Sequence, residues 1–468
     1  MNQKLKYLLL AGGLMLLLNA CHKAELVDIS VPVVQAGNTI KSDTLKGSVK
    51  GTMLSGKTYY FNSDITINDG DTLLMQSGVK LIALGDGKTA ATAPEIFNHG
   101  TFISLGTKGQ PNYITVKNAA DLHTQAAAQN YTNVFQGWWG GMVCTPAAPT
   151  AANPTPAGGD VIIKWTHIEF AGSPAGANNE TAVYKQGDPR YNIYFGNIKK
   201  NFIVEDSWFF GAKDDNIRVV GGKISIMRNT FELCGGAGGE FVNMKSGTVG
   251  DLAFNMCIGS ATNALKASDS GTSGTQCNVN MYNNTIVNGG YRQTKTGRGG
   301  SIDYEAGARG LVYNNLIVNC RFGVRITNDA DVANVVYGNQ FFYGYSAAIV
   351  GQFYASDGIG KGVGVSKSTD VISAIPQQNS PMFYGYDVNK YNFTTNPGPV
   401  TANLQPYNLL AVGAANFNLQ TASPGINKAK TDFSPLKAVT TTGSFGADVT
   451  LPGKDIGAYQ EGGNGNLH

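Results

Sequence analysis

The chain has 468 residues, of which 42% are hydrophobic and only 14% charged, and 60 are glycines. This hydrophobic content excludes an intrinsically disordered protein, and the length allows a large buried core. The net charge is +3 and no block of Lys or Arg stands out, so we expect no nucleic acid partner.

The N-terminus has the pattern of an exported protein. A short basic region precedes a mostly apolar run at residues 7–18, which is too short to span a bilayer, since spanning takes about 20 apolar residues. We therefore expect a secretory signal peptide over residues 1–20. The run ends in the sequence LNAC at residues 18–21, which resembles the lipobox of bacterial lipoproteins and implies lipidation of Cys21. The alternative is ordinary cleavage near Ala20, with Cys21 incidental.

The residues after Cys21 bear on localisation. Asp at the next position is the usual inner-membrane retention signal of such lipoproteins, whereas this chain has His22. The resemblance therefore implies an outer-membrane protein that is attached to the membrane through lipid at Cys21. Surface lipoproteins of Bacteroidetes tend to carry an acidic cluster here, of which Glu25 and Asp28 are a diffuse version, so a surface-exposed and a periplasmic orientation both stay open. Residues 21–50 are expected to form a tether and lead-in.

From residue 51 onward the chain consists of short alternating apolar segments punctuated by Gly, Asn and Asp. Each segment is too short to form a stable sheet alone, so stacking of successive coils must supply the core. Six segments share one small polar position flanked by apolar residues, and these positions recur 22 to 31 residues apart. They are Ser207, Asn229, Asn255, Asn284, Asn315 and Asn339.

The recurring Asn predicts a specific fold. Asn tolerates the left-handed backbone conformation of a tight turn, and its amide can bond the equivalent Asn about 4.8 Å away in the next coil. Stacked Asn side chains therefore form a ladder inside the turn. We expect an all-β protein, a single right-handed parallel β-helix over residues 51–465, with about 11–14 coils and long loops at 146–159 and 377–408.

The chain resembles a known family in several segments. Residues 137–143, GWWGGMV, resemble the Trp-Gly-Gly strand of right-handed β-helix lipoproteins of Bacteroidetes, and residues 163–172 resemble the coil that follows it. Residues 417–426 and 455–459 resemble the closing coil of such proteins. The resemblance covers most of the mature chain and implies the fold of the pectate-lyase-like superfamily, which also contains polygalacturonases. It does not specify chemistry.

The cysteines do not predict a disulfide scaffold. With Cys21 lipidated, five remain, and an odd number leaves at least one free thiol. We interpret them as small buried hydrophobic residues. No Cys or His spacing of a metal site occurs, so no metal or other cofactor is expected. His167 is interpreted as a turn residue rather than a catalyst.

One motif is similar to a catalytic pair. Asp214 and Asp215 resemble the Asp-Asp pair of polygalacturonases, and two carboxyl groups suit glycoside hydrolysis because one acts as the acid and the other as the base. The partner motifs are missing, since no Gly-His-Gly follows and 325–327 matches only two residues of the Arg-Ile-Lys signature. The alternative is ordinary turn chemistry. Calcium beside the pair is a second option, without calcium-loop spacing to support it.

A second set of residues comes from aligning the strands that follow the ladder turns. Alternation places the middle residue of each strand outward, with the strand around Ile349 continuing the series. If the coils stack in order, Asp303 lies between Lys266 and Arg325. The outward residues are Arg218, Asn243, Lys266, Asp303 and Arg325, with Asp214, Asp215, Glu240 and Glu305 beside them.

This outward set suits a polysaccharide ligand. Arg binds the carboxylates of uronate sugars at two points, and Asp303 with Asp214 and Asp215 are the candidate catalytic residues. The alternative without a ligand is a row of paired charges that keeps the face soluble. We expect a monomeric outer-membrane lipoprotein whose β-helix face binds polysaccharide or another macromolecule without catalysis. A polysaccharide lyase or glycoside hydrolase that acts on uronate-containing glycan, and a structural or adhesive role, stay open.

Overall fold

The computed structural model describes residues 37–128, 130–177, 183–236, 238–293, 295, 297–356, 361–389 and 416–468. The expected signal peptide and Cys21 lie outside these ranges, so export and lipidation stay predictions. Within the ranges, no helix combines the length and the apolar character that crossing a membrane requires.

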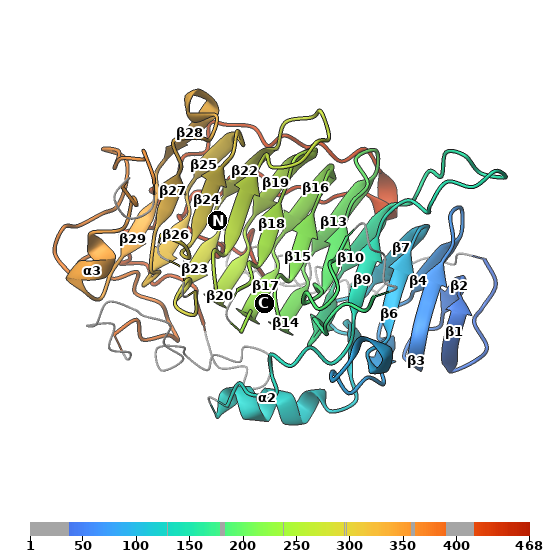
Figure 1. Ribbon diagram of the computed structural model, residues 1–468. Coiled ribbons are helices and arrows are strands. Elements are labelled where there is room, and N and C mark those ends of the chain that lie inside the picture. The colour runs from blue at the N-terminus through green and yellow to red at the C-terminus, as the bar shows by residue number, and fades with distance from the viewer. Residues whose placement is uncertain are drawn as a thin grey trace, which may run out of the picture. The chain divides into compact units, whose positions relative to one another are not determined.

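The expected right-handed parallel β-helix is confirmed (Figure 1). Successive coils stack in parallel, and all strand pairs run in the same direction. One sheet has ten strands, one from each coil. They are β2 (Gly51–Met53), β4 (Thr72–Met75), β7 (Thr101–Leu105), β10 (Val161–Lys164), β13 (Asn201–Glu205), β16 (Gly222–Met227), β19 (Thr248–Ala253), β22 (Asn278–Tyr282), β25 (Gly310–Tyr313) and β28 (Val335–Gly338).

A second sheet of nineteen strands forms two faces that meet at the long strand β3 (Thr58–Ile67). We call the first of them the β14 face. It contains β5 (Lys80–Ala83), β8 (Asn112–Val116), β11 (Thr166–Glu169), β14 (Trp208–Ala212), β17 (Thr230–Cys234), β20 (Met256–Ser260), β23 (Thr285–Val287), β26 (Leu316–Val318) and β29 (Phe341–Tyr343).

We call the other the β15 face. It contains β6 (Glu95–Asn98), β9 (Gly141–Cys144), β12 (Ile193–Phe195), β15 (Ile217–Val219), β18 (Val242–Met244), β21 (Leu265–Ser268), β24 (Ile302–Glu305) and β27 (Val324–Ile326). The described helices are short. They are α2 (Ala119–Ala127), α3 (Ala347–Val350), η1 (Ala90–Thr92), η2 (Val332–Asn334) and η4 (Gly443–Phe445).

The polar ladder lies in the turn that joins the ten-stranded sheet to the β14 face. Each side-chain oxygen accepts from the backbone N–H of the ladder residue one coil earlier, as Asn255 Oδ1 does from Asn229 N at 3.0 Å. The amides also bond each other, as Asn255 Nδ2 does with Asn284 Oδ1 at 3.0 Å. Five of the six predicted positions are confirmed, Ser207 to Asn315.

The sixth predicted position, Asn339, is wrong, because the ladder ends at Gln340. Gln340 Oε1 accepts from Asn315 N at 3.2 Å and from Asn315 Nδ2 at 3.1 Å. The residue before each ladder position has a left-handed backbone, and Asn339 occupies that place with φ of 50°. Asn339 and Gln340 are adjacent and both carry an amide, so the spacing of the repeat did not show which of the two belongs to the ladder.

The interior is apolar and continuous. Along the β14 face one inward column consists of residues such as Phe209, Phe231, Cys257 and Ile286, all essentially without exposure. Burial of such side chains contributes roughly 25 cal/mol per Å² of apolar surface. The five described cysteines are free and buried, as expected.

The limits of the β-helix differ from the expected 51–465. Strand β1 (Thr44–Ser48) lies within the expected tether, yet it pairs with β3, so the sheet begins before residue 51. Only Leu45 of β1 is buried, and this gave too weak an alternation to predict the strand. The loop expected at 146–159 is present between β9 and β10. That expected at 377–408 contains no strand over 377–389, and the rest lies outside the described residues.

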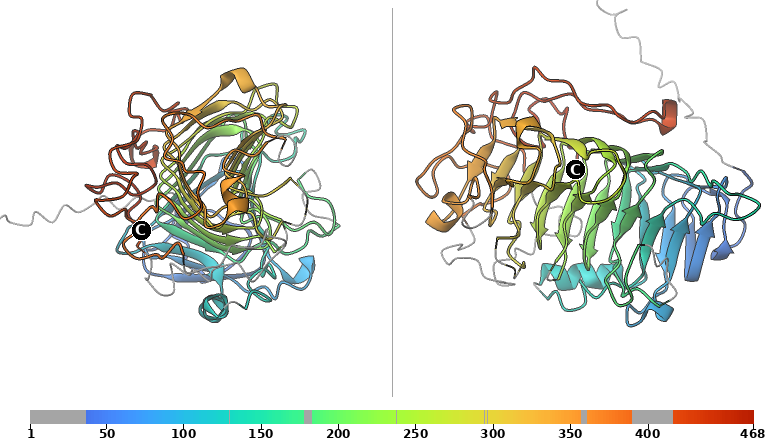
Figure 2. Two further views of the ribbon diagram at one scale, coloured as in Figure 1. Left: turned by 90° about the vertical axis from the view of Figure 1, so that its left-hand side faces the viewer. Right: turned by 45° about the horizontal axis from the view of Figure 1, so that its top comes forward.

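The C-terminal segment (residues 416–468) is not a closing coil. Residues 430–441 run along the outside of the β-helix from a late coil to β13, and residues 448–458 come back toward the late coils (Figure 2). Consequently the described residues form ten coils in the ten-stranded sheet, fewer than the expected 11–14. Ile456, Ala458 and Tyr459 pack on the outer side of β20, β23, β26 and β29.

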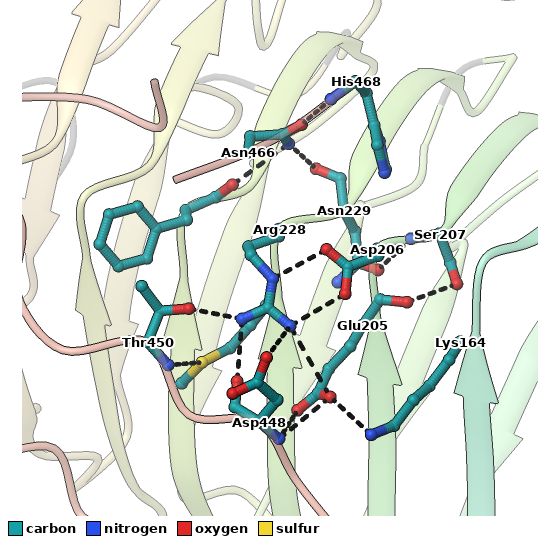
Figure 3. A network of polar contacts seen from close by, with 12 residues as sticks. Lys164, Glu205, Asp206, Ser207, Arg228, Asn229, Asp448, Thr450, Asn466 and His468 are labelled. Carbon is teal, nitrogen blue, oxygen red and sulfur yellow. Dashed lines mark hydrogen bonds and ion pairs between the residues drawn. The ribbon is translucent and has the colours of Figure 1, made fainter. Parts of the chain in front are cut away.

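A polar network holds this segment to β13 and β16 (Figure 3). Arg228 donates from Nε to Asp206 Oδ1 at 2.8 Å and from Nη1 to the carbonyl oxygen of Asp448 at 2.8 Å. The backbone N–H of Asp448 donates to Glu205 Oε1 at 2.9 Å, and Lys164 Nζ lies 3.2 Å from Glu205 Oε2. Because Glu205 has no exposed surface, its carboxyl oxygens depend on these donors for their hydrogen bonds.

The end of the ladder is tested by two neighbouring substitutions. Gln340→Ala should lower the free energy of unfolding by about 3 kcal/mol, because it leaves two buried N–H donors of Asn315 without an acceptor. Asn339→Gly should cost less than about 1 kcal/mol, because glycine adopts the same left-handed backbone. Urea unfolding of both variants checks this; equal losses would contradict the assignment of Gln340 to the ladder.

Candidate functional site

The strands of the β15 face place the predicted outward residues in one row. Arg218 is opposite Asn243, Asn243 is opposite Lys266, and the register continues through Asp303 to Arg325. The inner neighbours in each strand, such as Ile217 and Val219, have no exposure. Periodic burial therefore sets the row, as strand alternation predicts.

The expected continuation of the row around Ile349 is wrong. Residues Ala347–Val350 form helix α3, and Val324 pairs instead with Tyr354. The row extends in the other direction, since Tyr194 on β12 is opposite Arg218. A short apolar sequence does not distinguish a strand from a turn of helix.

Each cation of the row is paired with a carboxylate of the same face. Arg218 Nη2 lies 2.7 Å from Asp215 Oδ2, and Lys266 Nζ lies 2.8 Å from Glu305 Oε1. The third pair is Arg325 with Asp303, at 3.0 Å between Nε and Oδ1. The charges of the row are therefore compensated within the protein.

The two ends of the row differ in exposure. Asp303 has no exposed surface, and Arg325 also donates to the carbonyl oxygen of Gly297, so this pair lies under a loop. The Arg218 side chain is 26% exposed, and Asp214 and Tyr194 are half-buried. A ligand therefore has access mainly to the Arg218 end. Asp303 is not placed where a catalytic base would meet one.

Asp214, Asp215 and Glu240 gather at the accessible end. Asp214 and Asp215 lie in the turn between β14 and β15, and Glu240 precedes β18 in the next coil. Asp215 accepts from Glu240 N at 2.8 Å, from Arg218 Nε at 2.8 Å and from Asn243 Nδ2 at 3.1 Å. The predicted residues from two separate coils thus form one cluster.

The electrostatics of the cluster separate its three carboxyl groups. Burial alone would raise the pKa of Asp215, but the Arg218 guanidinium and hydrogen bonds from Glu240 hold it below its usual value. Burial and the charge of Asp215 raise the pKa of Asp214 to about 7. The same two causes raise the pKa of Glu240 well above its usual range. Asp215 is therefore the ionised carboxylate of the cluster, and Asp214 and Glu240 keep their protons to a higher pH than free carboxyl groups do.

Aromatic rings border the cluster. The guanidinium of Arg218 lies 4.4 Å from the ring centre of Tyr191, a cation–π contact. Tyr184, Tyr191 and Tyr194 pack together beside it. The accessible end of the row thus combines planar polar groups with tyrosine rings.

The cluster does not fit calcium. Calcium takes six to eight oxygen ligands, whereas Asp215 is engaged by Arg218, Asn243 and the backbone of Glu240. Over the ranges that the structure describes, no three His, Cys, Asp or Glu side chains are grouped as metal ligands.

The sequence did not reveal a pocket on the other face. It has a volume of about 590 Å³ and lies between helix α2 and strands β5, β8 and β11. His167, expected to be a turn residue, lies within strand β11 and lines this pocket with His123 and Glu169. The alternation around His167 could have shown that it points outward, but no sequence signal places α2 over it.

Comparisons with known proteins add no relative. A scan against protein-family models found no match, and searches of curated proteins and of solved structures found no similar protein. The parallel β-helix fold stands on the structure itself, and assignment to a lipoprotein family remains a proposal.

The carboxyl cluster predicts a pH-dependent stability. A carboxyl group whose pKa is raised in the folded state favours folding below its unfolded pKa near 3.8, and this contribution is lost as pH rises through about 7. Asp214→Asn removes the ionisation. The midpoint of thermal unfolding of this variant, minus that of the native protein, should therefore increase as pH is raised from 4 to 8. The exposed Asp43→Asn is the control. An Asp214→Asn difference that does not change with pH would contradict the assignment.

Proposed function

We propose that this protein binds polysaccharide through the accessible end of the β15 face and does not cleave it. The observation that carries the proposal is the grouping of Tyr194, Arg218 and Asp214 at that end, beside the buried Asp215 and Glu240. Sugar hydroxyls both donate and accept, and guanidinium, amide and carboxyl groups in one plane satisfy them in pairs. Tyrosine rings contribute apolar contact area with a polar edge.

The charges favour a neutral polysaccharide over the acidic one expected from the sequence. Arg218, Lys266 and Arg325 each have a carboxylate partner within hydrogen-bonding distance. A uronate at Arg218 or Arg325 would have to displace the buried Asp215 or Asp303 from its cation, and weakening a buried ion pair costs several kcal/mol. A neutral sugar requires no such exchange.

The repeat of the fold favours a chain over a small ligand. Equivalent side chains on consecutive coils lie about 4.8 Å apart, so the row from Tyr194 to Lys266 extends for roughly 14 Å. Asn243 and Lys266 are buried, so a linear polymer that runs along the β-helix axis would contact Tyr194 and Arg218 on neighbouring coils at this end of the row.

Glycoside hydrolysis is the second candidate, because one observation favours it. Asp214 and Asp215 are neighbours whose pKa values are displaced in opposite directions, a pattern that an acid and a base require. Against it, Asp215 already accepts hydrogen bonds from Arg218, Asn243 and the backbone of Glu240. The binding proposal is preferred for this reason.

Binding is tested with a panel of soluble neutral polysaccharides and polygalacturonate on native affinity gels and by calorimetry. A neutral member should retard the protein, and Tyr194→Ala should weaken the affinity about tenfold, or ~1.4 kcal/mol. Lys199→Gln, an exposed change in the turn between β12 and β13, is the control. Unaltered affinity of Tyr194→Ala would place binding elsewhere, and release of reducing ends would show hydrolysis instead.

The membrane anchor is a separate part of the proposal. The lipobox-like segment at residues 18–21 supports lipidation of Cys21 and attachment to the outer membrane. Cells expressing the chain and fed labelled palmitate should give a labelled protein in the membrane fraction, and Cys21→Ala should abolish the label. Labelling that survives Cys21→Ala would refute the anchor.

A further inference from the structure

The β14 face carries a pocket that is separate from the proposed polysaccharide surface. It is enclosed by α2 on one side and by β5, β8 and β11 on the other, and its volume of about 590 Å³ lies in the range of small-ligand sites. Its lining residues are Lys80, Ile82, Tyr113, Thr115, Ala119, Ala120, His123, Thr124, His167 and Glu169. The row around Arg218 contributes none of them.

One wall of the pocket carries the rings of Tyr113 and His167, which belong to a stack that continues beyond the pocket to Trp208. The rings of Tyr113 and His167 are 4.3 Å apart and nearly parallel, and those of His167 and Trp208 are 4.2 Å apart. Lys80 Nζ lies 5.7 Å from the centre of the Tyr113 ring, on the next coil. Because the ring faces contact one another along the axis, their polar edges are what a ligand would meet.

Glu169 connects helix α2 to the sheet through hydrogen bonds. It is 2% exposed, its Oε2 accepts from Thr115 Oγ1 at 2.6 Å, and its Oε1 accepts from His123 Nε2 at 3.1 Å. His123 is part of α2, so this bond fixes the opposite wall. Although burial opposes it, bonding to His123 and Thr115 holds the pKa of Glu169 below its usual value. The negative charge in the pocket is therefore already engaged by the protein.

His167 offers a polar atom that the described residues do not satisfy. Its Nδ1 is buried and has no hydrogen-bond partner, and the nearest carboxylate oxygen, Glu169 Oε1, is 4.0 Å away. Burial lowers the pKa of His167 to about 4, so the ring is neutral at pH 7. The nearby carboxylate favours the proton on Nδ1, which makes this atom a donor toward an acceptor oxygen.

Lys80 supplies the accessible charge. It is exposed at the edge of the stack, while the only carboxylate among the lining residues, Glu169, is buried and bonded. The pocket therefore presents a cation, the phenol of Tyr113, the hydroxyl of Thr124 and the Nδ1 donor of His167. Its volume far exceeds that of a simple anion, since a water molecule takes up about 30 Å³.

We propose that this pocket binds an acidic sugar unit, with its carboxylate or sulfate group at Lys80 and its hydroxyl oxygens at Tyr113 and His167. The small side chains of Ala119 and Ala120 leave room for the apolar face of the sugar ring. This site differs in place and in ligand charge from the polysaccharide surface on the β15 face, and it does not depend on that surface.

Calorimetry of the folded protein tests the site with trigalacturonate, a sulfated trisaccharide and maltotriose. The Tyr194→Ala variant, in which the β15 face is weakened, should bind at least one acidic trisaccharide and bind maltotriose at least tenfold more weakly. Lys80→Gln should weaken acidic binding at least tenfold. His167→Phe should weaken it as well, because it keeps the stacked ring and removes Nδ1. Lys199→Gln, with the same loss of charge in the turn between β12 and β13, is the control and should bind as the native protein does.

The two acidic probes separate the sources of charge. Binding of trigalacturonate alone assigns the pocket to carboxylates, and binding of both assigns it to acidic sugars in general. The proposal is overturned if neither acidic probe binds, if maltotriose binds the Tyr194→Ala variant as well as the acidic probes do, or if Lys80→Gln binds the acidic probes as the native protein does. If Tyr194→Ala loses the binding of the acidic trisaccharides and Lys80→Gln keeps it, the proposal is also overturned and these ligands are assigned to the β15 face. Lys80 is exposed, so this arm stands even if His167→Phe fails to fold.

Discussion

The vertical repeat of the coils is the constraint on which the rest of this structure depends. Every residue of a coil lies about 4.8 Å from its equivalent in the next coil. A side chain therefore has to pack against, or hydrogen-bond with, the equivalent side chains of the coils on either side. Asn meets this condition in the ladder turn, because one amide oxygen accepts the backbone N–H of the preceding coil while its NH₂ bonds the next oxygen. The register that the ladder turn sets also aligns all the remaining rows of side chains.

The same repetition acts on the outside with two different results. On the β15 face each cation of the row has a carboxylate partner within or beside the row, so the charges are neutralised in pairs. On the β14 face the row from Tyr113 to Trp208 consists of aromatic rings that stack. Stacking thus gives one face of compensated charge and one face of ring edges, and the two suit ligands of different charge.

Segments outside the repeat decide which parts of these rows remain accessible. The C-terminal segment covers the late strands of the β14 face, and its last residue, His468, stacks on Trp208 with 3.9 Å between ring centres. Helix α2 stands over the early strands and leaves a pocket. The loop at Gly297 covers the Asp303–Arg325 pair, so the open part of the β15 face is the end at Arg218.

The sequence by itself determined the β-helix, the free buried cysteines and the register from Arg218 to Arg325, because apolar alternation and the recurring Asn depend on local spacing and repeat in every coil. It did not distinguish Asn339 from Gln340, since both are amides and only the left-handed backbone at Asn339 separates them. Tertiary structure alone decided the return path of residues 416–468, the pairing that neutralises the cations and the place of α2 over His167. These depend on contacts between residues far apart in the chain, for which a local pattern carries no information.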